Sequence, residues 1–264
     1  MNPDSADTSE YASYLALEEI LAAQRPRSEE HDEVLFIVVH QVHELWFKQL
    51  LHELADLQRQ LERGATAGSL QTLRRSLRIL KVVVSPIDVL DTLTPRQFAG
   101  FRAKLGNGSG FQSAQFREIE AVLGRRDTRT IDQYPAGCAE RNRIEAAMMR
   151  PSVFDSFLGY LAKRGFPVPA GYLHRDVTEQ HEPSRQLQLM LLDVYQVDDE
   201  VAQICDLLVE LDQAMQEWRF RHVSMVARII GGKPGTGGST GASYLRTTLF
   251  RQSFPDLWAA RSLI

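Results

Sequence analysis

The chain has 264 residues, with 30 Lys+Arg against 34 Asp+Glu, seven His and two Cys. This slightly acidic balance argues against a nucleic-acid-binding protein, and two cysteines exclude a disulfide scaffold or a Cys-rich zinc site. The polar start MNPDSADTSEY lacks the basic residues and apolar run of a secretory signal. The longest wholly apolar stretch, residues 34–39, is too short to span a membrane. We therefore expect a cytoplasmic protein that binds neither nucleic acid nor membrane.

The first half of the chain has a helical pattern. Residues 11–24 are predicted to form a first helix with acidic residues in its first turn. A long helix is predicted over about residues 29–63, because apolar side chains recur there at spacings of three and four and form one stripe. A third helix runs from residue 70 to about 84. Pro86 is expected to kink or end it, because proline has no N–H to donate.

The second half continues this pattern. Thr94 and Pro95 suit the N-cap and first position of a short helix to residue 104. A second long helix is predicted over about residues 199–230, followed by the loop GGKPGTGGSTG and a short packed tail. Shorter helices are expected at residues 113–123, 137–150, 152–163 and 184–195, with a loop at 106–113 and irregular chain at 166–182. No strand-like alternation of useful length occurs, so we expect one all-α domain over residues 1–264, a helical bundle built on the long helices.

His40 stands beside the stripe of the first long helix. His43 and Glu44 follow it at three and four residues, so the three side chains share a helix face and are a candidate metal site. No HExxH motif is present, which argues against a zincin-type site. The alternative is a core histidine that donates to a backbone carbonyl, and residue spacing leaves both interpretations open.

His222 lies inside the apolar stripe of the second long helix. A buried imidazole needs a polar partner, and a heme iron or another metal would supply one. A core histidine with a partner from the protein is the alternative. The arginines of the WRFRH segment that ends at His222 either meet acidic groups such as heme propionates or lie on a solvated face.

Two further features suggest ligand contacts. Arg102 precedes a Gly-rich loop and is able to grip a carboxylate, although an arginine at a helix end is commonly a surface residue. The loop at residues 231–241 does not match a phosphate-binding loop, because Lys233 is followed by proline. It is either a flexible linker or a loop that closes over a ligand with Thr236 as a contact. Tyr11 and Tyr14 share a helix face, for which core packing is the simplest explanation.

Four segments together resemble the tryptophan 2,3-dioxygenase family in order and approximate spacing, from residue 11 to the C-terminus, with a loose match over about 125–180. They are YASYLALEEILAAQ, HDEVLFIVVHQVHELWFKQLLHEL, FRAKLGNGSGFQSAQFRE and WRFRHVSMVARIIGGKPGTGGSTGASYLR. The resemblance implies an all-helical bundle that encloses a heme pocket. It also implies heme b with Fe²⁺ as the active form, O₂ as co-substrate and assembly as a homotetramer.

The resemblance also implies roles for residues at the matching positions. His222 corresponds to the proximal iron ligand. His40 corresponds to the catalytic distal histidine that meets the indole N–H. Phe36 would line the indole pocket, and Phe98 and Leu105 would flank it.

Other roles concern the substrate head group and the heme edge. Arg102 would grip the substrate carboxylate, and Thr236 would contact the amino-acid head group. Ser109 would lie near a heme propionate, with Gly110 of the same SGFQS motif also binding the cofactor.

The resemblance assigns the N-terminal helix, about residues 9–24, to a contact with a neighbouring subunit. Tyr11 and Tyr14 would enter that subunit's active site. The main departure is Ile87, which stands where the family usually has an aromatic residue packed at the heme.

Two reactions fit this resemblance. The first cleaves the indole C2–C3 bond of L-tryptophan with O₂ to give N-formylkynurenine, the kynurenine-pathway reaction. The second inserts one oxygen atom into tryptophan or a methylated tryptophan to give a 2-oxindole in a natural-product pathway. A heme-binding helical scaffold without activity, and a non-heme metal site at His40, His43 and Glu44, are the remaining hypotheses.

Overall fold

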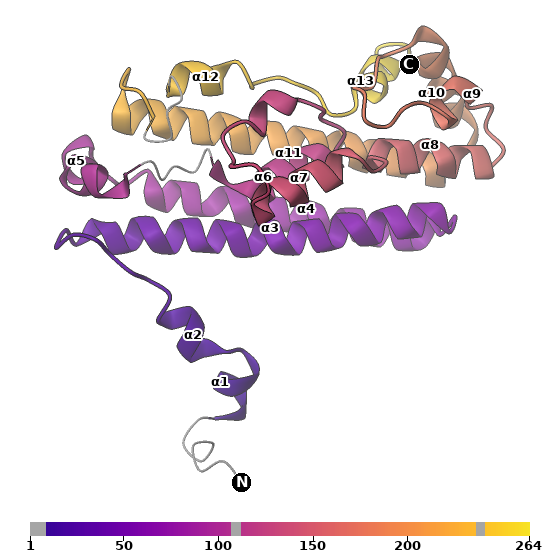
Figure 1. Ribbon diagram of the computed structural model, residues 1–264. Coiled ribbons are helices and arrows are strands. Elements are labelled where there is room, and N and C mark those ends of the chain that lie inside the picture. The colour runs from indigo at the N-terminus through magenta and orange to yellow at the C-terminus, as the bar shows by residue number, and fades with distance from the viewer. Residues whose placement is uncertain (1–8, 107–111, 236–240) are drawn as a thin grey trace.

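The computed structural model describes residues 9–106, 112–235 and 241–264, and this described part is helical with no strand. The expected all-α fold is therefore confirmed. The three longest helices are α3 (Asp32–Glu62), α4 (Thr66–Leu90) and α11 (Asp199–Ile230), and they run side by side with α4 in contact with both others (Figure 1). None of the described helices has a stretch long and apolar enough to cross a membrane.

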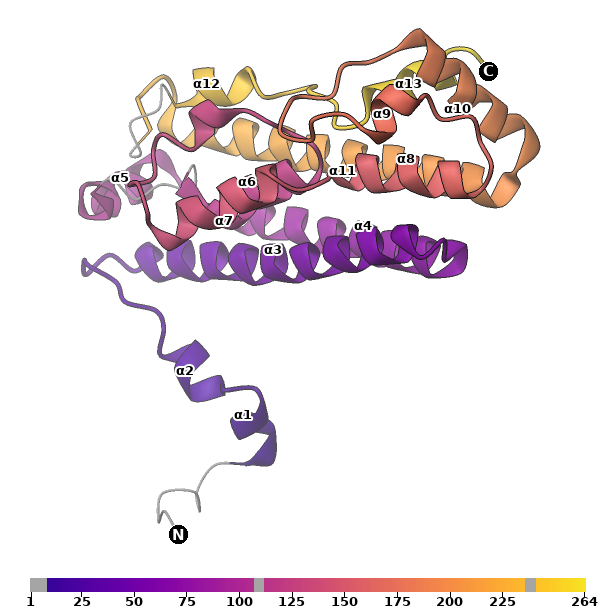
Figure 2. The same ribbon diagram turned by 45° about the vertical axis from the view of Figure 1, so that its right-hand side comes forward.

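Shorter helices cover this three-helix frame. In both views α5 and α12 lie at one end of the long helices, α6 and α7 over their middle, and α8, α9, α10 and α13 toward the other end (Figures 1 and 2). Their bounds are α5 Pro95–Arg102, α6 Ala114–Val122, α7 Ala139–Met148, α8 Val153–Lys163, α9 Ala170–Leu173, α10 Arg185–Val197, α12 Ala242–Arg246 and α13 Pro255–Arg261. Residues 166–182, expected to be irregular, contain only the single turn of α9.

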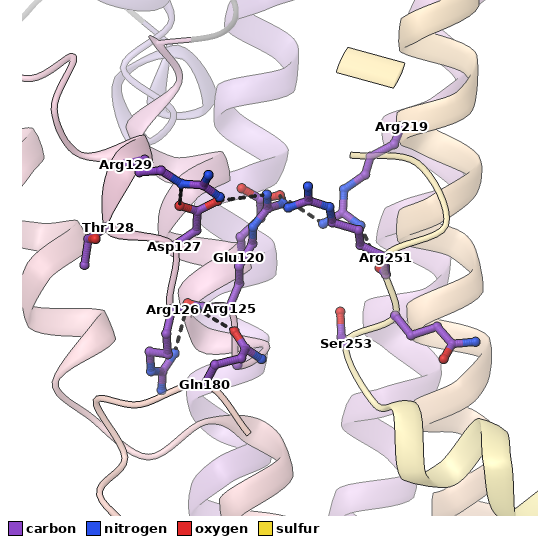
Figure 3. A pocket seen from close by; sticks show the side chains of 12 residues that line it. Glu120, Arg125, Arg126, Asp127, Thr128, Arg129, Gln180, Arg219, Arg251 and Ser253 are labelled. Atoms are coloured by element: carbon purple, nitrogen blue, oxygen red, sulfur yellow. Dashed lines mark hydrogen bonds and ion pairs between the residues drawn. The ribbon is translucent and has the colours of Figure 1, made fainter. Parts of the chain in front are cut away.

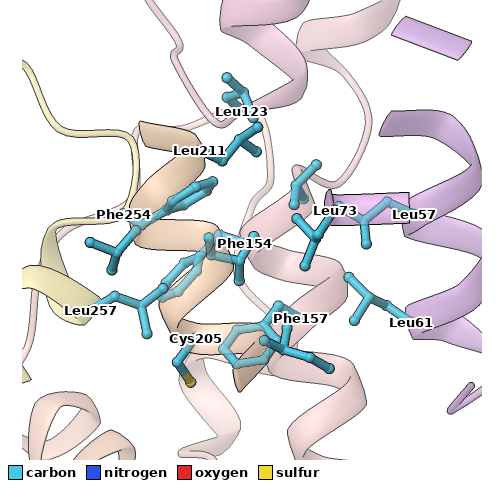
Figure 4. Close-up of a cluster of buried hydrophobic side chains, with 14 of the residues drawn as sticks. Leu57, Leu61, Leu73, Leu123, Phe154, Phe157, Cys205, Leu211, Phe254 and Leu257 are labelled. Carbon is cyan, nitrogen blue, oxygen red and sulfur yellow. The ribbon is translucent and has the colours of Figure 1, made fainter. Parts of the chain in front are cut away.

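The long helices pack through the apolar stripes that the sequence predicts. The stripe of α3 buries Leu50, Leu54, Leu57 and Leu61, each at most 1% exposed. These side chains meet buried residues of α4, α8, α11 and the C-terminal tail in one continuous core (Figure 4). Burial of such a stripe supplies most of the stability of a helix in a protein, so the frame is held by this core.

The prediction of one helix over residues 11–24 is wrong in detail. The segment forms two short helices, α1 (Glu10–Tyr14) and α2 (Leu17–Leu21), separated by Ala16 with φ +49°. A left-handed alanine cannot continue a right-handed helix. Neither helix has a buried residue, so the packing that would hold one continuous helix is missing within the chain.

This N-terminal arm, residues 9–24, extends away from the bundle (Figures 1 and 2). Its end is held by Gln41 of α3, whose Nε2 donates to the Ala23 carbonyl at 3.1 Å and whose Oε1 accepts from Gln24 at 2.6 Å. Tyr11 is 70% and Tyr14 89% exposed, so the expectation that they pack in the core is wrong.

Pro86 does not end α4, which was one of the two outcomes expected from the sequence. The helix continues to Leu90, and Ile87 and Leu90 beyond the proline are 3% and 4% exposed. Proline inside a helix removes one hydrogen bond and costs about 3 kcal/mol. Burial of two large aliphatic side chains, at about 1.5–3 kcal/mol each, outweighs that cost.

A second apolar cluster joins four helices at the end of the bundle where α5 lies. Its buried members come from α3, α4, α5, α11 and the turn after α4, and they are Val39, Ile87, Leu90, Leu93, Phe101, Met225 and Ile229. The capping box of Thr94 with Gln97 starts α5 at the predicted position. This cluster fixes α5 against the first turns of α3 and the last turns of α11.

Buried charges tie α6 to α11. The Glu120 carboxylate accepts from Arg117 at 2.6 Å. It also accepts from Arg125 at 2.7 Å and from Arg219 at 3.0 Å, and these residues are drawn in Figure 3. Burial alone would raise the pKa of Glu120, but the three guanidinium charges outweigh it and lower the pKa to about 2. The carboxylate therefore stays ionised and holds three cations that would otherwise repel one another.

The substitution Glu120→Gln is expected to lower the free energy of unfolding at pH 7 by about 3 kcal/mol, because it leaves buried cations without their anion. The folded-state pKa lies below the unfolded value of 4.5, so this stabilisation is present above pH 4.5 and lost as pH falls toward 2. Urea unfolding between pH 7 and 3.5 should show a smaller loss of stability with acid for the variant than for the unchanged chain.

Glu145→Gln is the matched control, because Glu145 forms a partly exposed pair with Arg141 on α7. It should change stability by less than about 0.5 kcal/mol. Equal stability and equal pH dependence of Glu120→Gln and the unchanged chain would contradict the assigned role of Glu120.

Candidate functional site

His40 of α3 and His222 of α11 line one cavity. The helices that carry them are brought together with α4 and α5 by the second apolar cluster. His43 and Glu44 also border the cavity, and its walls are mainly apolar or aromatic, formed by Phe47, Ile87, Leu90, Phe116, Trp218 and Met225. An apolar cavity with a few polar groups is the usual form of a small-molecule or cofactor site.

His222 presents a neutral imidazole to this cavity. Desolvation, with smaller contributions from His40, His43 and Arg117, lowers the pKa of His222 to about 4, so the ring is neutral at pH 7. The Trp218 ring stacks on it with centroids 5.1 Å apart and planes 6° from parallel. Within the described residues neither nitrogen of His222 has a hydrogen-bond partner, so a nitrogen lone pair is available to a metal.

These residues fit a heme. A neutral imidazole is a common axial ligand of heme iron, and the apolar walls suit the porphyrin ring. Two arginines of the WRFRH segment are already paired with protein carboxylates. The buried Arg219 forms an ion pair with Glu120, and the more exposed Arg221 forms one with Asp88 at 3.2 Å.

His40 has a defined tautomer. Its Nδ1 lies 2.7 Å from the Phe36 carbonyl oxygen, which only accepts, so Nδ1 carries the proton. Burial lowers the pKa of His40, so the ring is neutral and Nε2 is left as an acceptor. The core-histidine interpretation is thus correct for one ring nitrogen, while the other remains available to a ligand.

The non-heme metal site suggested at His40, His43 and Glu44 does not form. His43 donates from Nε2 to the Val83 carbonyl at 3.0 Å, and Glu44 accepts from Gln115 at 2.8 Å. The part of the chain that the structure describes contains no group of three His, Cys, Asp or Glu side chains placed to hold a metal ion. His43 therefore serves as a wall residue with its ring fixed by α4.

The ring of Phe36 links His40 to a group of aromatic side chains. The ring centroid of Phe36 lies 4.1 Å from that of His40, 5.9 Å from Phe98 and 5.5 Å from Phe101. Leu105 packs against the same cluster. The structure thus brings Phe36, Phe98 and Leu105 together in one apolar cluster, as the resemblance implies, and places His40 beside Phe36.

Arg102 connects α5 to the chain that follows α11. One of its terminal nitrogens donates to the Pro234 carbonyl, and no carboxylate of the described residues pairs with it. The backbone of Gly241 lies close to that of Lys233. A Cβ atom added to Gly241 would be 2.6 Å from the Lys233 carbonyl oxygen. Only glycine permits this approach, and its φ of +66° is also one that glycine adopts readily.

The other expected site residues fall into two groups. Ser109, Gly110 and Thr236 lie outside the described residues. Tyr11 and Tyr14 lie on the N-terminal arm, exposed and away from the bundle of their own chain.

Several wall residues were not predicted from the sequence, above all Trp218, Met225 and Phe116. Trp218 and Met225 belong to the apolar stripe of α11, and a stripe by itself indicates only a buried face. Their positions, four residues before and three after His222, place all three side chains on one helix face. That spacing was the available signal, whereas Phe116 reaches the cavity from a separate helix and had none.

Comparison with known proteins agrees with this geometry. The family model described as tryptophan 2,3-dioxygenase matches residues 2–152 and 182–264. The chain is 60% identical over 254 residues to a tryptophan 2,3-dioxygenase of Anaeromyxobacter sp. (strain K), covering 96% of each chain. It is 50% identical to one from Herpetosiphon aurantiacus, covering 96% of this chain and 97% of the relative, and 42% identical to one from Caulobacter vibrioides with the same coverage. With matches of this length and identity, the chain belongs to the tryptophan 2,3-dioxygenase family.

Proposed function

We propose that this chain is a heme-dependent dioxygenase that inserts O₂ across the indole C2–C3 bond of L-tryptophan and forms N-formylkynurenine. The observation that carries the proposal is the placement of His40 and His222 on one apolar cavity, in a chain of this family. Two histidines from separate helices provide one ligand for a cofactor and one contact for a substrate.

His222 would hold the iron of heme b through a ring nitrogen. Ferrous heme supplies the activation of O₂, which protein side chains alone do not achieve. The stacked Trp218 ring fixes the plane of the imidazole, and the apolar walls exclude water from the cavity. Ser109 and Gly110 are proposed to lie at the heme edge on the basis of the SGFQS motif.

His40 would orient the indole ring. With Nδ1 donating to Phe36, its Nε2 accepts the indole N–H, while the rings of Phe36 and Phe98 and the side chain of Leu105 line the slot. A hydrogen bond to a fixed neutral histidine positions C2 and C3 of the indole without requiring full proton transfer to His40.

Arg102 and Thr236 would bind the amino-acid head group. A guanidinium forms two parallel hydrogen bonds to a carboxylate, and a hydroxyl is a suitable partner for the ammonium group. Arg102 already contacts the chain beside the loop that carries Thr236.

We further propose that residues 1–264 form one domain that assembles as a homotetramer. The N-terminal arm exposes Tyr11, Tyr14, Leu15 and Leu21 to solvent in the isolated chain. Exposed apolar side chains on a projecting arm are typical of a surface buried by another subunit. Tyr11 and Tyr14 would complete the active site of that subunit.

Ile87, the departure from the family pattern noted in the sequence, borders the cavity at 3% exposure. The product therefore needs direct measurement. The purified protein is loaded with heme, reduced with ascorbate without oxygen, and given L-tryptophan with ¹⁸O₂. We expect a product that contains two labelled oxygen atoms. A product with one added oxygen would replace the dioxygenase assignment with 2-oxindole formation, and absence of turnover would indicate a heme-binding scaffold.

His222→Ala is expected to abolish stable heme binding, because the cavity loses its free imidazole. Heme content per chain and the Soret band give the measurement, and circular dichroism checks that the helices persist. His52→Ala is the control, since His52 is exposed on α3. Heme retention with an unchanged spectrum in His222→Ala would refute the ligand assignment.

Arg102→Ala is expected to raise KM for L-tryptophan roughly 10- to 100-fold, because a charge-assisted hydrogen bond contributes about 1.5–3 kcal/mol. The heme spectrum should stay unchanged, since Arg102 does not line the cavity wall at His222. Arg96→Ala on the same helix removes an exposed arginine and serves as control. An unchanged KM in Arg102→Ala would exclude it as the carboxylate contact.

A further inference from the structure

A polar cleft of about 560 Å³ opens beside the Glu120 cluster, apart from the His40–His222 cavity. Figure 3 shows it between the segment around Asp127 on one side and Arg219, Arg251 and Ser253 on the other. No aromatic or aliphatic side chain lines it. An indole ring would find no aromatic or aliphatic side chain to pack against there, so the cleft suits a polar ligand better than an indole amino acid.

The lining of the cleft has an excess of positive charge. Five arginines border it, namely 125, 126, 129, 219 and 251, against the two carboxylates Glu120 and Asp127. Both carboxylates are shared. Glu120 accepts from Arg125 and Arg219, and Asp127 accepts from Arg129 at 2.8 Å with Arg125 at 3.6 Å. Counted over the whole lining, the positive charges therefore exceed the negative charges by three.

Two of these arginines have no carboxylate partner in the described structure. Arg126, 9% exposed, donates only to backbone carbonyls, including those of Val177 at 2.8 Å and Arg150 at 2.9 Å. The side chain of Arg251 is exposed at the mouth and pairs with no described residue. Arg219 is 5% exposed, and its Nε is buried without a hydrogen-bond partner among the described residues. A positive charge at the low exposure of Arg126 is costly without an anion, and a bound anion would offset that cost.

We propose that this cleft binds a small oxyanion with two negative charges, either phosphate or a short dicarboxylate. Planar guanidinium groups with paired N–H donors match the oxygen atoms of both ligand types. The hydroxyls of Thr128 and Ser253 and the amide of Gln180 add neutral donors around the same space.

The proposed site is separate from the reaction cavity but adjoins it through one wall. Glu120 and Arg219 border the cleft and also a narrow space beside His222. Arg219 precedes His222 by three residues, one turn of α11. The anion would lie on the outer side of this charged pair, so it does not compete with a cofactor held at His222.

Calorimetric titration of the heme-loaded protein with inorganic phosphate, and separately with succinate, tests the proposal at constant ionic strength set by sodium chloride. We expect saturable binding of at least one anion. Arg251→Gln should weaken it about tenfold or more, corresponding to the loss of one charge-assisted contact, and Arg251→Lys should restore part of it. Tighter binding of phosphate would assign a tetrahedral oxyanion, and tighter binding of succinate a dicarboxylate.

Arg63→Gln is the matched control, because Arg63 is exposed at the end of α3 and forms no ion pair within the described residues. It removes the same charge and should leave the affinity unchanged. Arg251→Gln itself should unfold at the same urea concentration as the unchanged chain, since no described residue pairs with its side chain. Absence of saturable binding of both anions to the heme-loaded protein, or equal affinity in Arg251→Gln and the unchanged chain, would overturn the proposal.

Discussion

The burial of three apolar stripes against one another is the constraint on which the rest of the structure depends. Helices α3, α4 and α11 each have one apolar face, and each face is buried only where the helices lie side by side. Once they are packed, their rotation about their own axes is fixed. His40 and His222, which stand on or beside these faces, are then directed into the same space. The site is thus a consequence of the core and needs no separate element to assemble it.

Features encoded by local periodicity were predictable from the sequence. The second long helix was predicted over residues 199–230 and has these bounds in the structure, and Asp198 caps it. The grouping of Phe36 with His40 follows from one helical turn, and the grouping with Phe98 from the family resemblance. The break at Ala16 was not predictable, because the sequence pattern of the arm is helical and the missing support is tertiary.

Features formed by contacts between distant parts of the chain left no signal in the sequence. Glu120 and Arg219 lie 99 residues apart, and neither stands in a pattern that pairs it with the other. The same holds for Phe116, which reaches the cavity from α6, and for Arg251, which joins the polar cleft from the segment before α13. Charged residues are usually solvated, so a sequence interpretation places them on the surface unless a partner is known.

The proline inside α4 has a consequence for the cavity on the neighbouring helix. Pro86 offers no N–H to the carbonyl of Val82, which weakens the hydrogen-bond ladder of α4 at this turn. The next carbonyl, that of Val83, accepts from Nε2 of His43. The ring of His43 is thus held by the turn of α4 that contains the proline, so the orientation of a side chain on α3 depends on the path of the neighbouring helix. A change that shifts this turn of α4 would therefore move His43 in the cavity wall without altering any residue of α3.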